Sequence, residues 1–156
     1  MLDDLSQDFW DRADDITAGM LSADGAAPRP MAHQVRSDER AFYFITAKGT
    51  DIADAAQNGS AAQHIIACAH GQLYAAINGT LHVETSRDKL NDIWSPIAAV
   101  WFDDGREDED ICLVRFTPKD ADVWTTDGTA KTLYEFGKAA LTDDLPDVGD
   151  HAKLHF

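Results

Sequence analysis

Residues 29–50 read RPMAHQVRSDERAFYFITAKGT, and this stretch decides the predicted fold. It predicts a β-hairpin. Met31–Val35 is compatible with an extended strand, and Ala41–Thr46 is an aromatic and β-branched run typical of a buried strand. Ser37–Arg40 supplies a polar turn between the two.

The loop after this hairpin favours an anionic ligand. A helix is expected to begin at Thr50 or Asp51, because both are good N-caps. The first N–H groups of a helix attract phosphate, and Thr46, Lys48 and Thr50 can add hydroxyl and ammonium donors. Positions 25–50 hold four basic and two acidic residues, a local net charge of +2, in a chain whose net charge is −15. Such a stretch tolerates an anionic ligand, although a hairpin whose charges only face water explains the same composition.

The composition indicates one soluble, cytoplasmic domain. A chain of 156 residues, of which 44% are hydrophobic, fits a single core. The acidic N-terminus is unlike a signal peptide, and no apolar run is long enough to span a bilayer. The excess of acidic residues repels nucleic acid and anionic membranes. Cys68 and Cys112 lie in apolar runs, which favours reduced, packed thiols over a disulfide.

Periodicity and turn signals predict the other elements, and Gly79 inside a long alternating strand predicts a bend or bulge. The expected elements are a helix over 3–19, a short helix over 51–58, strands over 63–69 and 73–84 that pair as a second hairpin, a helix capped by Ser86 and interrupted by Pro96, strands over 111–116 and 121–125 joined by a turn at 118–120, and a helix over about 129–141. About six strands in hairpins, with helices at the margins and no βαβ series, favour a small antiparallel barrel.

Several segments, taken in order, resemble a known family. They are Arg29-Pro30-Met31-Ala32, Phe44-Ile45-Thr46, Asn78-Gly79-Thr80, Trp94-Ser95-Pro96, Trp101-Phe102-Asp103-Asp104-Gly105, Val114-Arg115-Phe116-Thr117-Pro118 and Ala121 to Trp124. Their order and spacing resemble the general stress protein 26 branch of the pyridoxamine 5′-phosphate oxidase-like FMN-binding split barrels. The resemblance implies a mainly β fold with flanking α: a six-stranded antiparallel split β-barrel (Greek key). It forms a single domain over 1–156, with the barrel at about 20–125.

The same resemblance implies that FMN lies in a groove between the two subunits of a homodimer. The residues implied to contact it are Arg29, Pro30 and Met31 beside the isoalloxazine, Ile45 and Thr46 at the ring and ribityl chain, Lys48 and Thr50 at the phosphate, Asn78 on the long strand, and Trp101 and Trp124, which would close the groove from the same or the second subunit.

One position departs from the family pattern. Family members commonly have a phosphate-pairing lysine where Ile52 stands in this sequence. Charged hydrogen bonds are the strong ones, so its loss would weaken FMN binding unless Lys48 substitutes for it. If the loss is real, replacing Ile52 with lysine is expected to tighten FMN binding.

The leading hypothesis is therefore a homodimeric, FMN-binding oxidoreductase-like protein, with a small redox substrate or a nicotinamide donor as its partner. No catalytic residue is assigned, because the flavin carries the redox chemistry. Pyridoxamine 5′-phosphate oxidase activity is not predicted, since no second phosphate site is evident. The alternative is a non-catalytic protein of the same fold, either a flavin sensor or store or a cofactor-free form. Haem or deazaflavin binding is a third possibility.

Histidines close to one another raise the question of a metal site. His64, Cys68 and His70 lie within seven residues. Zinc sites need a second ligand pair at suitable spacing, which the sequence lacks, so no metal is predicted.

Overall fold

A computed structural model describes residues 2–126, 141 and 149–156 of the chain. The helices are α1 (Leu2–Asp14), α2 (Asp51–Gln57), α3 (Arg87–Ile93) and α4 (Pro96–Ala99), with 3₁₀ turns η1 (Ser37–Glu39) and η2 (Gly105–Glu107). The strands are β1 (Ala18–Ala23), β2 (Ala26–Ala32), β3 (Gln34–Arg36), β4 (Ala41–Ala47), β5 (Ala61–Cys68), β6 (Leu73–Val83), β7 (Ile111–Thr126) and β8 (Gly149–His155). The helix predicted over about 129–141 lies outside the described residues apart from position 141. No helix in the described part of the chain is both long and apolar enough to cross a bilayer.

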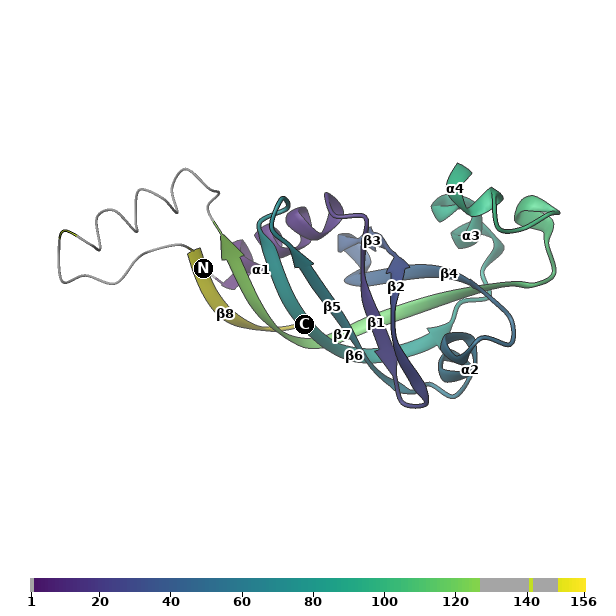
Figure 1. Cartoon of the computed structure of the whole chain (residues 1–156), viewed down its shortest axis with the longest axis horizontal. Helices are drawn as coiled ribbons and strands as arrows, with labels where there is room; N and C mark the ends of the chain where they lie inside the picture. The colour runs from purple at the N-terminus through teal and green to yellow at the C-terminus, as the bar shows by residue number, and fades with distance from the viewer. Residues whose placement is uncertain (1, 127–140, 142–148) are drawn as a thin grey trace.

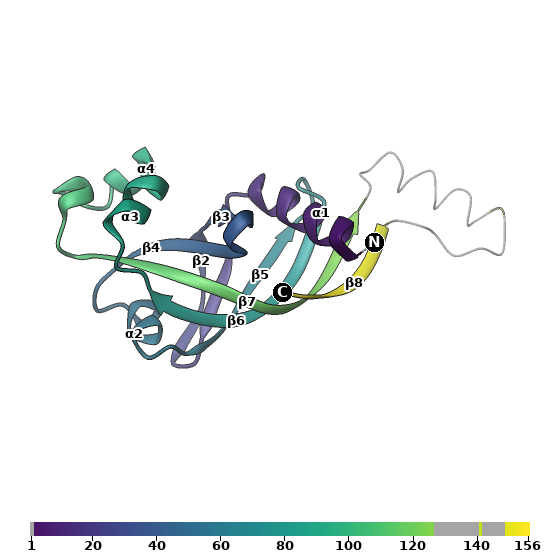
Figure 2. The ribbon, with the colours of Figure 1, turned by 180° about the vertical axis from the view of Figure 1, so that it is seen from behind.

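The strands form one strongly curved antiparallel sheet (Figure 1). Their order is β2-β1-β5-β6-β7-β4-β3, and β8 also pairs with β7. The first half of β7 pairs with β4 and its second half with β8. Helix α1 lies across the concave side of the sheet, where it contacts β3, β6 and β8 (Figure 2). The predicted mainly β split barrel with flanking helices is confirmed, but the described residues form a sheet of eight strands and not six.

The predicted turn at 118–120 is wrong, because β7 runs without interruption for 16 residues. Pro118 pairs with Gly79 of β6, and the register of the two strands shifts between Asn78 and Gly79. A Cβ atom at Gly79 would lie 2.2 Å from the carbonyl oxygen of Thr117. The close approach lets the two strands bend together, so Pro118 sits at a bulge and not in a turn. The bulge predicted at Gly79 is confirmed.

The N-terminal helix ends at Asp14, five residues before its predicted end. Strand β1 begins at Ala18 and pairs with both β2 and β5. A Cβ atom at Gly19 would lie 2.6 Å from Cε1 of His64, so only glycine permits this close strand packing. The helical spacing of apolar residues continues to Met20 in the sequence, but the pairing of β1 with β2 and β5 ends the helix earlier.

The predicted first hairpin is also divided differently. Strand β2 ends at Ala32, and a separate short strand, β3, pairs with β4 through Gln34 and Tyr43. His33 stands between β2 and β3 and is buried.

Among the residues that the structure describes, two apolar clusters hold the fold together. The main core lies on the concave side. The alternation of β6 predicts Leu73, Ala75, Ile77, Leu81 and Val83 on one face; the first four are buried there, whereas Val83 is 36% exposed. The second core lies between α3 and the other face of β4 and β7, and it contains Ala41, Tyr43, Leu90, Ile93 and Leu113. Ser86 caps α3 by accepting a hydrogen bond from the N–H of Lys89, and the helix ends before Pro96, as predicted.

Candidate functional site

Three of the predicted residues meet at the end of β4. Oγ1 of Thr50 caps α2 by accepting from the N–H of Ala53 at 3.2 Å, and it donates to the carbonyl oxygen of Ala47 at 2.9 Å. The Thr46 hydroxyl lies 3.2 Å from the Thr50 hydroxyl. Because Thr50 gives its proton to Ala47, Thr46 is the donor in that pair. Both hydroxyl groups thus donate their protons to acceptors within the chain. These hydrogen bonds fix the shape of the turn that carries Lys48.

Lys48 is the exposed cation of this turn. Its backbone N–H donates to the carbonyl oxygen of Asp110 at 2.7 Å. Burial raises the pKa of the Cys112 thiol, and the charge of Lys48 acts on the same pKa in the opposite direction. Cys112 pairs with Thr46 across the two strands, so the Lys48 ammonium group lies near the end of β4.

The basic stretch is only partly neutralised by ion pairs. Nε of Arg36 lies 3.0 Å from Oδ2 of Asp92. Neither Arg29 nor Lys48 forms an ion pair with another residue that the structure describes. These two cations therefore remain available to an anion.

Arg29, Pro30 and Met31 lie on β2, an edge strand of the sheet. Directly paired residues of antiparallel strands share one face. Arg29 pairs with the buried Leu21, so its side chain emerges on the concave side at the edge. Pro30 pairs with Met20, which lies on the outer face. Met31 is half-buried against the main core.

Ile52 is fully buried in the main core. The expectation that lysine at position 52 tightens FMN binding required a side chain that can reach a phosphate, and a fully buried side chain does not meet this requirement. A lysine there would place a charge in an apolar core and destabilise the fold, whatever it did to a phosphate. The first turn of α2 also carries Asp51 and Asp54, which repel an anion.

Other predicted residues lie elsewhere. Asn78 is on the outer face of the sheet, where it accepts from Nε2 of Gln63 at 3.1 Å and donates to Oδ1 of Asp120 at 2.9 Å. Trp124 stacks on His151, with ring centroids 4.6 Å apart. Trp101 follows α4 and is 79% exposed. Ile45 packs against the second core, so its side chain and that of Thr46 face opposite sides of β4.

The ten predicted residues therefore do not converge within one chain. Thr46, Lys48 and Thr50 come together, with Arg29 on the concave side. Asn78 and Trp124 lie on the opposite, outer face of the same sheet.

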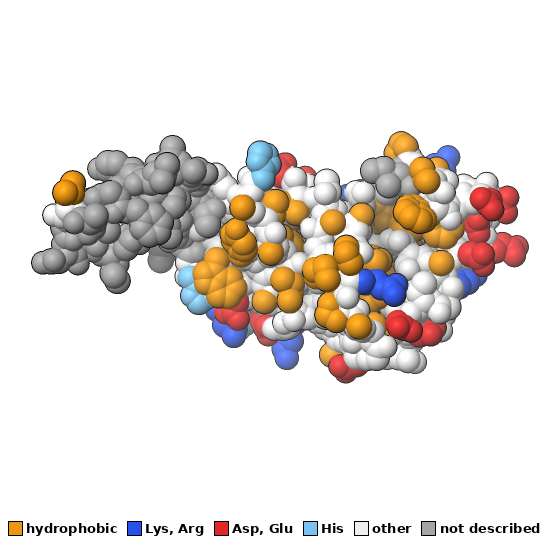
Figure 3. Space-filling view, viewed as in Figure 1, with side chains coloured by type: hydrophobic (Ala, Val, Ile, Leu, Met, Phe, Trp, Pro, Cys, Tyr) orange, Lys and Arg blue, Asp and Glu red, His pale blue; other side chains and the backbone are white. Residues whose placement is uncertain are grey.

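The outer face carries an apolar patch that joins several strands. Met20, Ile65, Tyr74 and Trp124 are each 37–43% exposed. Met20 pairs with Ile65, and Tyr74 pairs with Trp124. We refer to these four residues as the outer-face patch. Figure 3 shows hydrophobic side chains gathered over β1, β5, β6 and the far end of β7.

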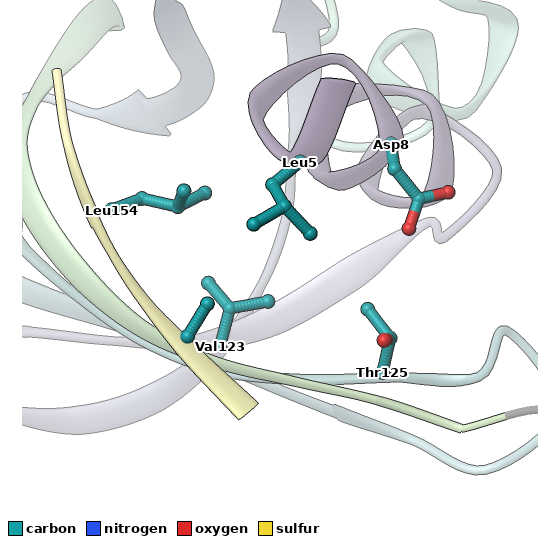
Figure 4. Close-up of a pocket in the computed structure, with 6 residues that line it drawn as sticks. Leu5, Asp8, Val123, Thr125 and Leu154 are labelled. Atoms are coloured by element: carbon teal, nitrogen blue, oxygen red, sulfur yellow. The ribbon is translucent and has the colours of Figure 1, made fainter. Parts of the chain in front are cut away.

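In the described part of the chain, two pockets lie away from the predicted site. One has a volume of about 10 Å³, which is room for about one water molecule. It lies between α1, β7 and β8, where Leu5, Val123 and Leu154 point toward one another (Figure 4). The other, of about 530 Å³, is lined by Asp104, Glu107, Asp108, Glu109 and Asp110, whose charges would repel a phosphate. Neither pocket contains any of the ten predicted residues.

The histidines form a contact that the sequence did not reveal. His33 and His64 are both buried, and their rings are hydrogen-bonded. They are 31 positions apart and follow no common pattern, so no sequence signal links them. No group of three or more potential metal ligands occurs in the described part of the chain. Cys112 is buried and Cys68 half-buried, and both are free thiols, as predicted.

Comparisons with known proteins give a consistent result. The sequence model of the family described as pyridoxamine 5′-phosphate oxidase like matches residues 4–147. A protein of Jannaschia sp. CCS1, assigned as a general stress protein 26, is 43% identical; the match covers 98% of this chain and 99% of that one, with a TM-score of 0.91. The general stress FMN/FAD binding protein of Xanthomonas citri is 24% identical over 81% of this chain and 92% of that one, with a TM-score of 0.73, and so supports the fold alone. No curated protein matches.

Proposed function

Because this chain belongs to the pyridoxamine 5′-phosphate oxidase-like family, we propose that it is a flavin-binding protein of the general stress protein 26 type. In this proposal FMN lies between the two subunits of a homodimer and serves the oxidation or reduction of a small molecule. The name of the Xanthomonas citri protein, which includes FMN/FAD binding, is in line with a flavin.

The observation that carries the proposal is the exposed Lys48 in a turn held by Thr46 and Thr50. The turn fits a phosphate, because Lys48 forms no ion pair with any residue that the structure describes and can therefore pair with an anion. Arg29 on the adjacent edge strand adds a second available cation. Met31, on the same face of β2 as Arg29, offers apolar surface to a planar ring, whereas Pro30 faces the outer side of the sheet.

The distribution of the predicted residues over two faces supports a shared site. One flavin cannot touch Arg29 on the concave side and Asn78 on the outer face of the same subunit while the sheet lies between them. In the proposed dimer, the Lys48 turn of one subunit lies against the outer face of the other. The outer-face patch supplies apolar surface for such an association.

The roles of the chain's own residues follow from these positions. FMN, when bound, supplies the hydride and electron chemistry through its isoalloxazine ring. Lys48 binds the phosphate, and the threonine hydroxyls keep the turn in position. Arg29 would stabilise negative charge near the ring, and Met31 would exclude water from one side of it.

A second candidate function is a flavin-free or non-catalytic protein of the same fold. It is favoured by the burial of Ile52 together with Asp51 and Asp54 in the first turn of α2, because these leave Lys48 as the main phosphate cation. The visible spectrum of the purified protein separates these readings, since flavin, deazaflavin and haem absorb differently.

The test is FMN retention after desalting, followed by titration of FMN into wild type and Lys48→Met. Loss of one charged hydrogen bond, about 1.5–3 kcal/mol, corresponds to roughly 10- to 150-fold weaker binding. Lys119→Met, an exposed change elsewhere, is the matched control and should bind as wild type does. Failure of the wild-type protein to retain FMN would favour the second candidate. Equal affinity of Lys48→Met and wild type would remove Lys48 from the site.

A further inference from the structure

A buried histidine pair connects three elements beneath α1. Nδ1 of His33 lies 2.9 Å from Nε2 of His64, and Nε2 of His33 lies 3.0 Å from the carbonyl oxygen of Ala13. His33 is 5% exposed and His64 is not exposed at all. The pair therefore links the last turn of α1, the β2–β3 junction and β5.

The hydrogen bonds fix where the protons lie when both rings are neutral. The carbonyl of Ala13 can only accept, so Nε2 of His33 carries a proton and Nδ1 of His33 is an acceptor. His64 then donates from Nε2. Its other nitrogen, Nδ1, is buried and has no hydrogen-bond partner.

No arrangement of the pair accommodates an added proton well. Protonation puts an N–H on Nδ1 of His64, where there is no acceptor. The rings around His64 are Phe42, Phe44 and Phe116, with centroids 5.1–6.2 Å away, and they provide no compensating anion. The charged group that acts on the pair from α1 is Asp14, which favours a charge on His33. Burial, and then the neighbouring His33, lower the pKa of His64 to about 3.

Helix α1 can separate from the sheet without breaking any strand pairing. Its backbone takes no part in the strand ladder. Side chains hold it in place: Phe9 and Trp10 in the main core, the bond from His33 to Ala13, and a bond of 2.8 Å from Arg12 to the carbonyl oxygen of Gln72. Contiguous units of a protein open with different free energies, so a helix near a chain terminus can open while the central strands stay paired.

We propose that the His33–His64 pair is an acid-sensitive latch, which holds α1 over the concave side of the barrel when neutral and releases it when protonated. Release exposes the face of the main core that α1 covers, while β5, β6 and β7 stay paired. The proposal does not depend on flavin binding.

The size of the effect follows from proton linkage. A histidine that is neutral in the closed form and titrates with an ordinary pKa of about 6.5 in the open form raises the opening constant about 30-fold between pH 7.5 and pH 5. Two such histidines raise it about 1,000-fold. At both pH values the amides of α1 should exchange more readily than those of β6 and β7.

Native-state hydrogen exchange of the full chain tests this directly. Protection factors, which correct for the intrinsic effect of pH, are measured for residues 9–14 and for β6 and β7 at pH 7.5 and 5. In wild type we expect the α1 protection factors to fall by 30-fold or more. In His64→Gln, which keeps a donor for His33 but does not titrate, the fall should be about 30-fold smaller than in wild type.

Two further variants complete the test. His64→Phe, which matches the surrounding rings, replaces His64→Gln if that variant does not fold. His82→Gln changes an exposed histidine on the outer face and should behave as wild type does. The proposal is overturned if the free energy of opening, calculated from hydrogen exchange, is the same for α1 as for the central strands. It is equally overturned if α1 protection is independent of pH, or if the His64 variants show the wild-type fall.

Discussion

Gly79 shows how one residue permits the bend of the whole sheet. Its missing side chain leaves room for the carbonyl oxygen of Thr117, which would lie 2.2 Å from a Cβ atom, and for Cα of Pro118 at 2.9 Å. Both obstacles are backbone atoms, so no side-chain rotation can relieve them. The requirement at this position is space and not an unusual φ angle.

Gly79→Ala is therefore expected to destabilise the protein by about 3 kcal/mol, because the β6–β7 bend must open to admit the methyl group. Urea unfolding followed by circular dichroism measures the change. The control is Gly25→Ala, where nothing lies within 4 Å but φ is +85°. That change should cost only about 1 kcal/mol of backbone strain. Equal losses in the two variants would argue against the steric explanation.

Buried histidines also make the global stability depend on pH. Burial lowers the pKa of His64 to about 3, and burial also lowers the pKa of His33. Because the folded pKa lies below the unfolded value of about 6.5, this stability is fully present above pH 6.5 and is lost as the pH falls toward 3. The free energy of unfolding should drop by up to about 1.4 kcal/mol per pH unit for each histidine. Urea unfolding at pH 7.5, 6.5 and 5.5 measures it, and a flat profile would contradict the assignment.

At the scale of the element, α3 is attached to the sheet by a polar cluster over the second core. The Tyr43 hydroxyl donates to Oε1 of Glu39 at 2.8 Å and accepts from Nη1 of Arg115 at 3.0 Å. Nζ of Lys89, on α3, pairs with Oε2 of Glu39 and lies 5.2 Å from the centre of the Tyr43 ring. Burial, and then the bond to Glu39, raise the pKa of Tyr43 to about 12, so the hydroxyl keeps its proton at neutral pH.

Tyr43→Phe should destabilise the protein by about 1–2 kcal/mol, because it leaves Glu39 and Arg115 without their shared partner. Thermal unfolding compares it with Thr117→Val, in which an exposed hydroxyl of β7 outside the outer-face patch is removed and no loss is expected. If the two variants have the same midpoint, the cluster does not contribute to the attachment of α3.

At the scale of the whole molecule, the outer-face patch is the surface on which the proposed dimer depends. Ile65→Glu introduces a charge at the middle of the patch, so we expect it to dissociate the dimer and to abolish FMN retention. Sedimentation at micromolar concentration measures the first effect and desalting the second. Gln57→Glu adds the same charge on α2 and should leave the dimer intact. A wild-type monomer at this concentration, or a dimer that persists in Ile65→Glu, would contradict the shared site.

The sequence by itself determined what depends on near neighbours in the chain: the alternation of β6, the Ser86 cap of α3, the break before Pro96 and the bulge at Gly79. Burial patterns, caps and turns arise within a few residues, so these features and the barrel class could be predicted. The residues of the Lys48 turn could be named for the same reason.

Only the tertiary structure decided the features that join distant segments. The continuity of β7, the end of α1 at Asp14, the burial of Ile52 and the His33–His64 contact all depend on which strands become neighbours. The same holds for the division of the candidate site between two faces of one sheet. A side chain's face and partners are set by the register of the folded sheet, and no local pattern encodes that register.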